Sequence, residues 1–491
     1  MKKSDLKNKK ILPDISVVIP VKNAENTIRT CIESILTQIV PPSEIIIVLN
    51  NSDGETKNII SDIALSVEKI KVISEKRKGR GAARNAGIIA SSGEIIAMTD
   101  ADCVVPKNWL SSITQPIIEE GENIVMGFEE DAVKNYWSKR MQEEDTRFIG
   151  TKKDGGYINH LDTKNFAIRR ELVRSFMFNP NLEAYEDWDF FLRIKRAELK
   201  IRFLPEIRVL HKHSSSASGV WCTQFYRAKS MERIFKSYRE DAFFKKYFLG
   251  DESAISRRWR NFLFFPPWVF LQFVKDPKRA PYRILADISW KAGILSEKIS
   301  FLFTSSCAFF FRKKFGIQME TPEISTILRS ITPPLNLLVF GVGNDSPLWH
   351  CINKGGKTVF IEDRMDWFIK KKKEYPFLEA YIVEYKTKIS EWRELLGNPK
   401  KLRLDFPKSV SETKWDMVLV DGPEGWAENT PGRMKSIYWS SRLVKKGGIV
   451  FVHDSEREVE RAYGEKYLWR EGIIAEVKGR SLLREYVAGK N

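Results

Sequence analysis

Two carboxylates, Asp100 and Asp102, follow an apolar run in the stretch IIAMTDADCV, residues 95 to 104. Side chains alternate along a strand, so two acids separated by one residue project to the same side where the chain leaves a sheet. Converging carboxylates repel each other unless a cation lies between them, and Mg²⁺ or Mn²⁺ bound to phosphate oxygens is such a cation. The alternative is a solvated turn, and this motif alone leaves both interpretations open.

A second acidic cluster and two histidines lie further along the chain. The stretch YEDWDFFLRI supplies Glu186, Asp187 and Asp189. Acids in such a position either take a proton from a reacting hydroxyl or cap the helix that follows. The stretch VLHKH ends another predicted strand, where His211 or His213 can offer a neutral imidazole to a metal. Of the two we expect His211 to be the ligand.

The stretch GRGAARNAG combines small residues with a cation. Gly79 and Gly81 allow the backbone to approach a ligand, and Arg84 can pair with diphosphate oxygens. The alternative is a surface loop that opens a helix.

A separate set of candidate residues lies near the C-terminus. In FGVGNDS, Gly341 and Gly343 allow a tight strand-to-helix turn, and Glu362 closes the next strand near the offset of a ribose-binding acid. The third glycine of the dinucleotide fingerprint is missing, which favours S-adenosylmethionine over NAD as the cofactor.

Three more polar residues end two later strands of this C-terminal part: Asp421, His453 and Asp454. They can bind a metal or activate a hydroxyl. The alternative is that the two aspartates cap the next helices.

The elements that position these residues alternate between strand and helix. Short β-branched runs such as ISVVIPV and EIIIVLN alternate with helical spacings such as that of residues 28 to 39, and the alternation resumes from residue 336 with NLLVFGVG, KTVFIED, WDMVLVDG and GGIVFVHD. Such alternation predicts mostly parallel α/β sheets that bind ligands at the carboxyl ends of their strands. Residues 215 to 330 instead read as helical, aromatic and basic. We therefore predict two doubly wound α/β domains joined by a helical segment.

Composition limits the compartment and the partners. The five cysteines are scattered and odd in number, which indicates reduced thiols in the cytoplasm. No secretory signal is visible, and no apolar run reaches the roughly 18 residues of a spanning helix. The net charge of +17 points to a polyanion. Because no nucleic-acid-binding motif is present, we expect no nucleic acid, and the aromatic and basic runs at 255 to 315 favour peripheral binding to an anionic membrane surface. The alternative is that these runs are helices packed between domains.

Taken together, DISVVIPVKNAENTI, EIIIVLNNSDG, GRGAARNAG, TDAD and YEDWDFFLRI resemble the family 2 glycosyltransferases of GT-A fold over roughly the first 215 residues. The resemblance implies a GT-A domain, placed at residues 1–235, and a nucleotide-sugar donor. It puts Pro20, Val21 and Glu25 near the base and ribose, makes Asp187 the base of an inverting transfer, and puts Glu186 near the acceptor. The family usually shows an Asp-Asp-Gly turn where this chain has Asn50 and Asn51, so the donor is a UDP-sugar or another nucleotide sugar.

The C-terminal motifs NLLVFGVGNDSPLWH, TVFIED, WDMVLVDGPEGWAENTPGRM and GGIVFVHDSEREVERAYGEKYL resemble the glucuronoxylan 4-O-methyltransferase family, over about residues 335 to 470. The resemblance implies a Rossmann-like methyltransferase domain, placed at 331–491 after a linker at 236–330. It implies S-adenosylmethionine as cofactor and a uronic-acid hydroxyl as acceptor, and Arg433 can clamp the sugar carboxylate with its planar fork.

The leading hypothesis is a bifunctional enzyme that adds a sugar to a glycan or lipid-linked glycan, using a divalent metal, and methylates a sugar hydroxyl. We expect it at the cytoplasmic face of the membrane. The alternative is a glycosyltransferase whose C-terminal domain is a non-catalytic carbohydrate-binding or scaffolding module.

Overall fold

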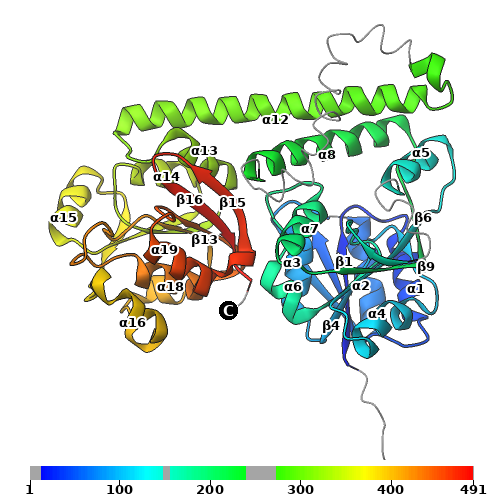
Figure 1. Ribbon diagram of the computed structural model, residues 1–491, viewed down its shortest axis with the longest axis horizontal. Coiled ribbons are helices and arrows are strands. Elements are labelled where there is room, and N and C mark those ends of the chain that lie inside the picture. The colour runs from blue at the N-terminus through cyan, green and yellow to red at the C-terminus, as the bar shows by residue number, and fades with distance from the viewer. Residues whose placement is uncertain (1–12, 53, 147–154, 239–271, 490–491) are drawn as a thin grey trace, which may run out of the picture. The chain divides into compact units, whose positions relative to one another are not determined.

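The computed structural model describes residues 13–52, 54–146, 155–238 and 272–489 (Figure 1). The chain divides into two compact units. The first comprises Met1–Arg174, Leu182–Gln224 and Arg260–Ser289, and the second comprises Ser175–Asn181, Phe225–Trp259 and Trp290–Asn491. The division falls inside three helices, α6 (Arg170–Phe176), α8 (Ala217–Tyr238) and α12 (Ala280–Phe315).

The first unit is built on a mixed nine-stranded sheet. Its strands are β1 (Ile15–Val21), β2 (Glu44–Asn50), β3 (Ile70–Glu75), β4 (Ile95–Met98), β5 (Cys103–Val104), β6 (Ile124–Asp131), β7 (Gly156–Ile158), β8 (Phe166–Arg169) and β9 (Ile201–His211). Its helices are α1 (Ile28–Leu36), α2 (Glu55–Ser66), α3 (Arg80–Ala90), α4 (Trp109–Glu119), α5 (Tyr136–Asp145), α6 (Arg170–Phe176) and α7 (Glu186–Arg196).

The strand order of this sheet is β3-β2-β1-β4-β8-β6-β9-β5, and β7 pairs with β9. Strands β1 to β4 are parallel, with β1 paired to β2 on one side and to β4 on the other. The chain therefore reverses its winding direction between β1 and β4. Ligands of open α/β sheets bind at the carboxyl ends of the strands at such a reversal.

The side chains of each strand point alternately to the two faces of this sheet. Ile15, Val17 and Ile19 of β1 lie in a core cluster with residues of α1 and α4. On the other face α3 packs on β1 and β2, where a Cβ at Gly87 would lie 3.2 Å from Cγ2 of Val48. Gly87 therefore allows α3 to approach the sheet closely, which fixes the helix that carries Arg84.

The second unit is built on a seven-stranded sheet. Its strands are β10 (Asn336–Phe340), β11 (Lys357–Glu362), β12 (Glu379–Ile382), β13 (Trp415–Val420), β14 (Val444–Val452), β15 (Ile473–Lys478) and β16 (Leu482–Val487). Its helices include α13 (Thr321–Ser330), α14 (Ser346–Ile352), α15 (Met365–Glu374), α16 (Trp392–Gly397), α17 (Lys408–Ser411), α18 (Met434–Leu443) and α19 (Glu458–Tyr463).

The order of this second sheet is β12-β11-β10-β13-β14-β16-β15. Strands β10 to β14 are parallel, and β16 pairs antiparallel with both β14 and β15. The winding reverses between β10 and β13, so the loops after these two strands meet at the expected ligand edge.

The predicted α/β alternation is confirmed in both units, and the predicted strands ISVVIPV and EIIIVLN coincide with β1 and β2. The antiparallel strands β8, β15 and β16 were not among the predicted elements. The predicted boundaries at 235 and 330 stay predictions, although α13 begins before residue 331 and packs on β15.

Candidate functional site

The carboxyl ends of β1 and β4 bring the first predicted residues together. Pro20 and Val21 close β1, and Asp100 and Asp102 follow the neighbouring strand β4. Glu25 lies in the loop after β1, where its Oε2 accepts a hydrogen bond from the Thr56 hydroxyl at 2.8 Å. A hydrogen bond to its own backbone and the Thr56 hydroxyl lower the pKa of Glu25. These residues therefore lie at one edge of the sheet, and their roles toward a donor stay predictions.

Arg84 links the two acidic motifs instead of facing solvent. Its Nη2 lies 2.7 Å from Oδ1 of Asp100, and its Nη1 pairs with Glu186, the residue before Asp187. The Arg84 side chain is 1% exposed. We predicted that Arg84 contacts the diphosphate, but its guanidinium is already held between two carboxylates, so this arrangement favours a positioning role.

Arg80 is the cation that the sequence interpretation missed. It begins α3 one helical turn before Arg84, on the same side of the helix, and its side chain is exposed. Desolvation disfavours its charged form, but the charges of Asp100 and Glu186 outweigh that effect and raise the pKa of Arg80. Arg80 thus supplies an accessible positive charge beside the acidic motif.

Asn50 ends β2, and its side chain is turned toward the loop between β3 and α3. Its Nδ2 donates to the carbonyls of Glu75 at 3.0 Å and Arg77 at 2.6 Å, and its Oδ1 accepts from the backbone N–H of Gly79 at 3.2 Å. Both amide protons are therefore used within the protein. Asn50 shapes the loop before α3, and its amide donors do not reach a nucleotide base.

Asp187 lies in the first turn of α7, partly exposed beside the buried Glu186. Burial and the negative charge of Glu186 raise the pKa of Asp187 to about 7. The N-cap position of α7 is held by Tyr185, so neither acid takes the capping role that was the alternative. A carboxylate with a pKa near neutrality suits a general base.

His211 ends β9 opposite the acidic motif. Its Nε2 lies 3.5 Å from Oδ2 of Asp102. Burial alone would lower the pKa of His211, but Glu129 and Asp102 raise it to about 10. Two ligand atoms at this separation fit a divalent cation, because ligands roughly 2.1 Å from Mg²⁺ or Mn²⁺ lie about 3 Å apart.

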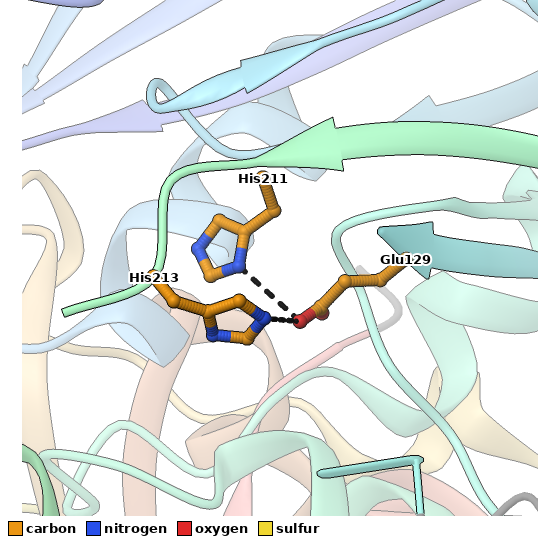
Figure 2. Close-up of side chains that lie close together, drawn as sticks. All are labelled: Glu129, His211 and His213. Carbon is orange, nitrogen blue, oxygen red and sulfur yellow. Dashed lines mark hydrogen bonds and ion pairs between the residues drawn. The ribbon is translucent and has the colours of Figure 1, made fainter. Parts of the chain in front are cut away.

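Glu129 and His213 extend this cluster (Figure 2). In Figure 2 one Glu129 oxygen faces both imidazoles, at 3.3 Å from Nδ1 of His211 and 2.7 Å from Nε2 of His213. The other Glu129 oxygen lies 2.6 Å from Nζ of Lys164. The ligand atoms of Glu129, His211 and His213 all lie within 4.8 Å of one another, as they would around a metal ion. Because Lys164 already neutralises Glu129, we assign Glu129 to orienting His211 with Nε2 toward Asp102.

In the second unit, Gly341 and Gly343 form the turn after β10. Gly341 has a φ of 111°, and a Cβ at Gly422, in the loop after β13, would lie 2.9 Å from the Cα of Gly341. The two loops at the winding reversal are therefore in close contact. Only glycine fits at both positions, as in a turn that admits a nucleoside.

Glu362 lies buried at the end of β11, as predicted for a ribose-binding acid. Its oxygens accept backbone N–H groups of Val342 at 2.9 Å, Asp363 at 3.1 Å and Arg364 at 3.0 Å. A carboxylate has about four acceptor positions, so one remains for a ribose hydroxyl. The residues present therefore fit an adenosyl group.

Asp421 and His453 come together at the ends of β13 and β14. Nδ1 of His453 lies 2.8 Å from Oδ1 of Asp421. Arg433 lies 3.4 Å from the same Asp421 oxygen and 2.9 Å from Oδ2 of Asp454, and it also donates to the His453 carbonyl at 2.6 Å. The N-caps of the next helices are Arg433 and Arg457, so neither aspartate caps them.

This arrangement bears on two predictions. Asp421, His453 and Asp454 were predicted either to bind a metal or to activate a hydroxyl, and the metal is the less favoured of the two because the buried Arg433 guanidinium stands between the two aspartates and already supplies the positive charge. For the same reason Arg433 is engaged within the protein and is not placed to clamp a sugar carboxylate. Sequence reasoning also missed Glu323 and Ser481, which contact Nε2 of His453 at 3.2 and 2.6 Å. Neither lies at the end of a predicted strand, so no local signal identified them.

Two family models match separate parts of the chain. Residues 16–176 match the model described as Glycosyl transferase family 2. Residues 319–404 and 398–486 match the model described as IRX15/IRX15L/GXM.

Two curated relatives each match about a third of the chain. Protein IRX15-LIKE of Arabidopsis thaliana is 39% identical over 196 residues, which is 35% of this chain and 61% of that protein. Glucuronoxylan 4-O-methyltransferase 3 of the same plant is 38% identical over 185 residues, 33% of this chain and 62% of that protein. The chain thus spans about three fifths of the length of these curated relatives.

Among solved structures, the mannosyltransferase PcManGT from Pyrobaculum calidifontis, in complex with GDP-Man and Mn²⁺, aligns with a TM-score of 0.45 at 17% identity, covering 60% of this chain and 90% of that one. The N-terminal region of this chain is thus similar to the family 2 glycosyltransferases and its C-terminal region to the IRX15/IRX15L/GXM family, as the motifs predicted.

Proposed function

We propose that this chain is a bifunctional enzyme of glycan biosynthesis. Its first unit transfers a sugar from a nucleotide-sugar donor with inversion, and its second unit transfers a methyl group from S-adenosylmethionine to a hydroxyl of an acidic sugar. The alternative, a second unit that only binds carbohydrate, remains an outcome of the experiments below.

The observation that carries the sugar transfer is the bridge from Asp100 through Arg84 to Glu186. This bridge fixes Glu186, the neighbour of Asp187, relative to Asp100 and Asp102, which we expect to face the donor. Asp187 takes the proton of the acceptor hydroxyl as that oxygen bonds to the anomeric carbon, and the bond from this carbon to the phosphate oxygen breaks. A divalent ion held by Asp102 and His211 would stabilise the charge on the departing diphosphate.

The methyl transfer is supported by the winding reversal between β10 and β13, where Gly341, Glu362 and Asp421 lie on one edge of the sheet. When bound there, S-adenosylmethionine would supply an electrophilic methyl group. Asp421 accepts the proton of the sugar hydroxyl. The hydroxyl oxygen then forms the bond to the methyl carbon as the bond from that carbon to sulfur breaks. The acidic acceptor is supported by the relative named Glucuronoxylan 4-O-methyltransferase 3.

The first test incubates the full chain with Mn²⁺ and a panel of UDP- and GDP-sugars and measures release of the nucleoside diphosphate. We expect turnover with one donor class in wild type and almost none in Asp187→Asn. Release that is equal in both proteins would contradict the proposed base.

We also propose that the chain lies on an anionic membrane surface through one face of α12. In the described part of the chain, α12 is the helix whose length and composition would allow it to cross a membrane. The sequence prediction required an uninterrupted apolar run and therefore excluded this helix. Residues 255 to 271 of the predicted aromatic and basic region, 255 to 315, lie outside the described residues.

The two sides of α12 differ. On one side Glu297 is 0% exposed and lies 3.1 Å from Nη2 of Arg233 in α8, and it also pairs with Arg329 in α13 (Figure 1). The other side carries exposed apolar side chains, namely Leu295, Ile299, Leu302, Phe303, Phe309 and Phe310. Because Glu297 is buried against protein helices in the middle of α12, we favour binding along the surface over crossing. The cations Arg312, Lys313 and Lys314 at its end suit anionic headgroups. Together with the reduced cysteines, this favours the cytoplasmic face.

A further inference from the structure

Glu323 lies on α13, before the seven-stranded sheet begins, yet its carboxylate reaches the end of β14. Its Oε1 lies 3.2 Å from Nε2 of His453 and accepts a hydrogen bond from the Ser481 hydroxyl at 3.2 Å. Its Oε2 accepts the backbone N–H of Glu320 at 2.6 Å. The side chain is 0% exposed. Burying a carboxylate is costly unless it is paired, so these partners account for its presence.

The hydrogen bonds around His453 assign both ring protons. Nδ1 faces Asp421 at 2.8 Å, and Nε2 faces the Ser481 oxygen at 2.6 Å, while the Ser481 hydroxyl donates to Glu323. Each ring nitrogen therefore has an acceptor opposite it, which is the pattern of a charged imidazole. The ring is held on both sides.

Ser481, His453 and Asp421 have the spacing of a nucleophilic triad, and that interpretation can be tested on geometry. The Glu323 carboxylate lies within 3.2 Å of both Ser481 Oγ and His453 Nε2. A negative charge there would destabilise the oxyanion intermediate of an acyl transfer. A charged imidazole, in addition, cannot take the serine proton. Ser481 is therefore not a nucleophile.

We propose that Glu323 and Ser481 are positioning residues of the methyl-transfer site, which hold His453 so that it orients Asp421. In this arrangement His453 binds Oδ1 of Asp421 and leaves the other oxygen for the sugar hydroxyl. The side chain of Asp421 is 28% exposed, so a sugar hydroxyl can reach this carboxylate. The inference rests on the proposed methyl transfer and extends the catalytic unit to α13.

The electrostatics of the cluster agree with this role. Burial alone would lower the pKa of His453, but its hydrogen bonds to the Asp421 and Glu323 carboxylates, together with the charges of Asp421 and Asp454, raise it to about 10. The other charged groups nearby are Arg433, which donates to the His453 carbonyl, and Asp345, whose pKa is raised to about 6 by burial and by the negative charge of Asp421. His453 therefore stays charged at neutral pH, and the sugar proton passes to Asp421.

Gly479 adds a steric argument for this position of Glu323. A Cβ at Gly479 would lie 2.7 Å from Cδ of Glu323. The loop between β15 and β16 thus lies against the Glu323 carboxylate, and a larger residue at position 479 would displace that carboxylate from its present position.

The test uses the full chain with Glu323→Gln, Glu323→Asp and Ser481→Ala, and Glu320→Gln, at the N-cap of the same helix, as the matched control because it leaves the backbone N–H that Glu323 accepts unchanged. Methyl transfer is measured with labelled S-adenosylmethionine and methyl β-D-glucuronide. We expect Glu323→Gln and Ser481→Ala to lower kcat about 10- to 100-fold with little change in the KM for S-adenosylmethionine. Glu323→Asp should recover part of the activity, and Glu320→Gln should match wild type.

A second readout is the ¹⁵N NMR spectrum of the histidines, of which the chain has only five. The charged signature of His453 should be present at pH 8 in wild type and Glu320→Gln and lost in Glu323→Gln. A charged His453 with unchanged kcat in Glu323→Gln and Ser481→Ala would overturn the positioning role. Should wild type transfer no methyl group, the proposed function fails, and the NMR comparison alone decides whether Glu323 holds His453.

Discussion

Nε2 of His211 lies 3.5 Å from Oδ2 of Asp102, so the end of β9 faces the acidic motif after β4. Glu129 contacts Nδ1 of the same imidazole, so Nε2 is the ring nitrogen that stays turned toward Asp102. We therefore predict that His211→Ala lowers Mn²⁺ affinity by roughly 10- to 100-fold, measured by electron paramagnetic resonance of free Mn²⁺. His350→Ala, in the second unit, is the control. Sugar transfer that persists undiminished in EDTA would remove the metal from the account.

Asp187 sets the expected pH dependence of sugar transfer. Its pKa is raised to about 7, and a base must be deprotonated to act, so kcat should rise as the pH increases through about 7 and level off above it. Asp187→Asn should lower turnover by about 10² to 10⁴-fold while donor affinity changes little. An equal loss of donor affinity and turnover would make Asp187 a ligand contact instead.

Arg80 and Arg84 should respond differently to substitution. We expect Arg80→Gln to weaken binding of Mn²⁺ with UDP or GDP about tenfold, because a charged hydrogen bond contributes about 1.5–3 kcal/mol. Calorimetry of each nucleotide measures this effect, and Lys78→Gln, at an exposed position two residues away, is the control. Arg84→Gln should lower the melting temperature, since it leaves Asp100 and Glu186 without their shared cation. Unchanged affinity in Arg80→Gln would place the diphosphate elsewhere.

The sequence predicted the parallel strands of both sheets because β-branched runs and helical spacing are local patterns, but it did not predict the antiparallel strands β8, β15 and β16. It also located Asp100, Asp187, His453 and Asp421, since each lies at or next to the end of a predicted element. It did not predict which neighbours these side chains engage. Glu323 and His453 are 130 residues apart, and Asn50 and Gly79 are 29 apart. Such contacts depend on how elements pack, and no periodicity in the chain encodes them.

The exposed side of α12 gives a prediction about membrane binding. Phe303 is 72% exposed, and its replacement in Phe303→Glu, combined with Phe309→Glu, should abolish flotation with anionic liposomes. Leu65→Glu is the control, because Leu65 is 89% exposed on α2. Raising the salt concentration should weaken wild-type binding by screening the basic end of the helix. Wild-type protein that does not float with anionic liposomes would instead indicate that the exposed side of α12 packs against protein.

If one chain carries two transfers, the intact mass of the lipid-linked glycan from cells lacking the gene should report both. These cells are complemented with wild type, Asp187→Asn or Gly343→Asp. Wild type should restore both the sugar and the methyl group. Gly343→Asp should restore the sugar without the methyl group. Asp187→Asn should restore neither the sugar nor a methyl group attached to that sugar. Gly343→Asp acts on the cofactor turn, since even a Cβ at Gly343 would lie 2.5 Å from Oδ1 of Asp345. A glycan mass that is the same with all three proteins would contradict both transfers, and a methyl group restored by Gly343→Asp would contradict the second.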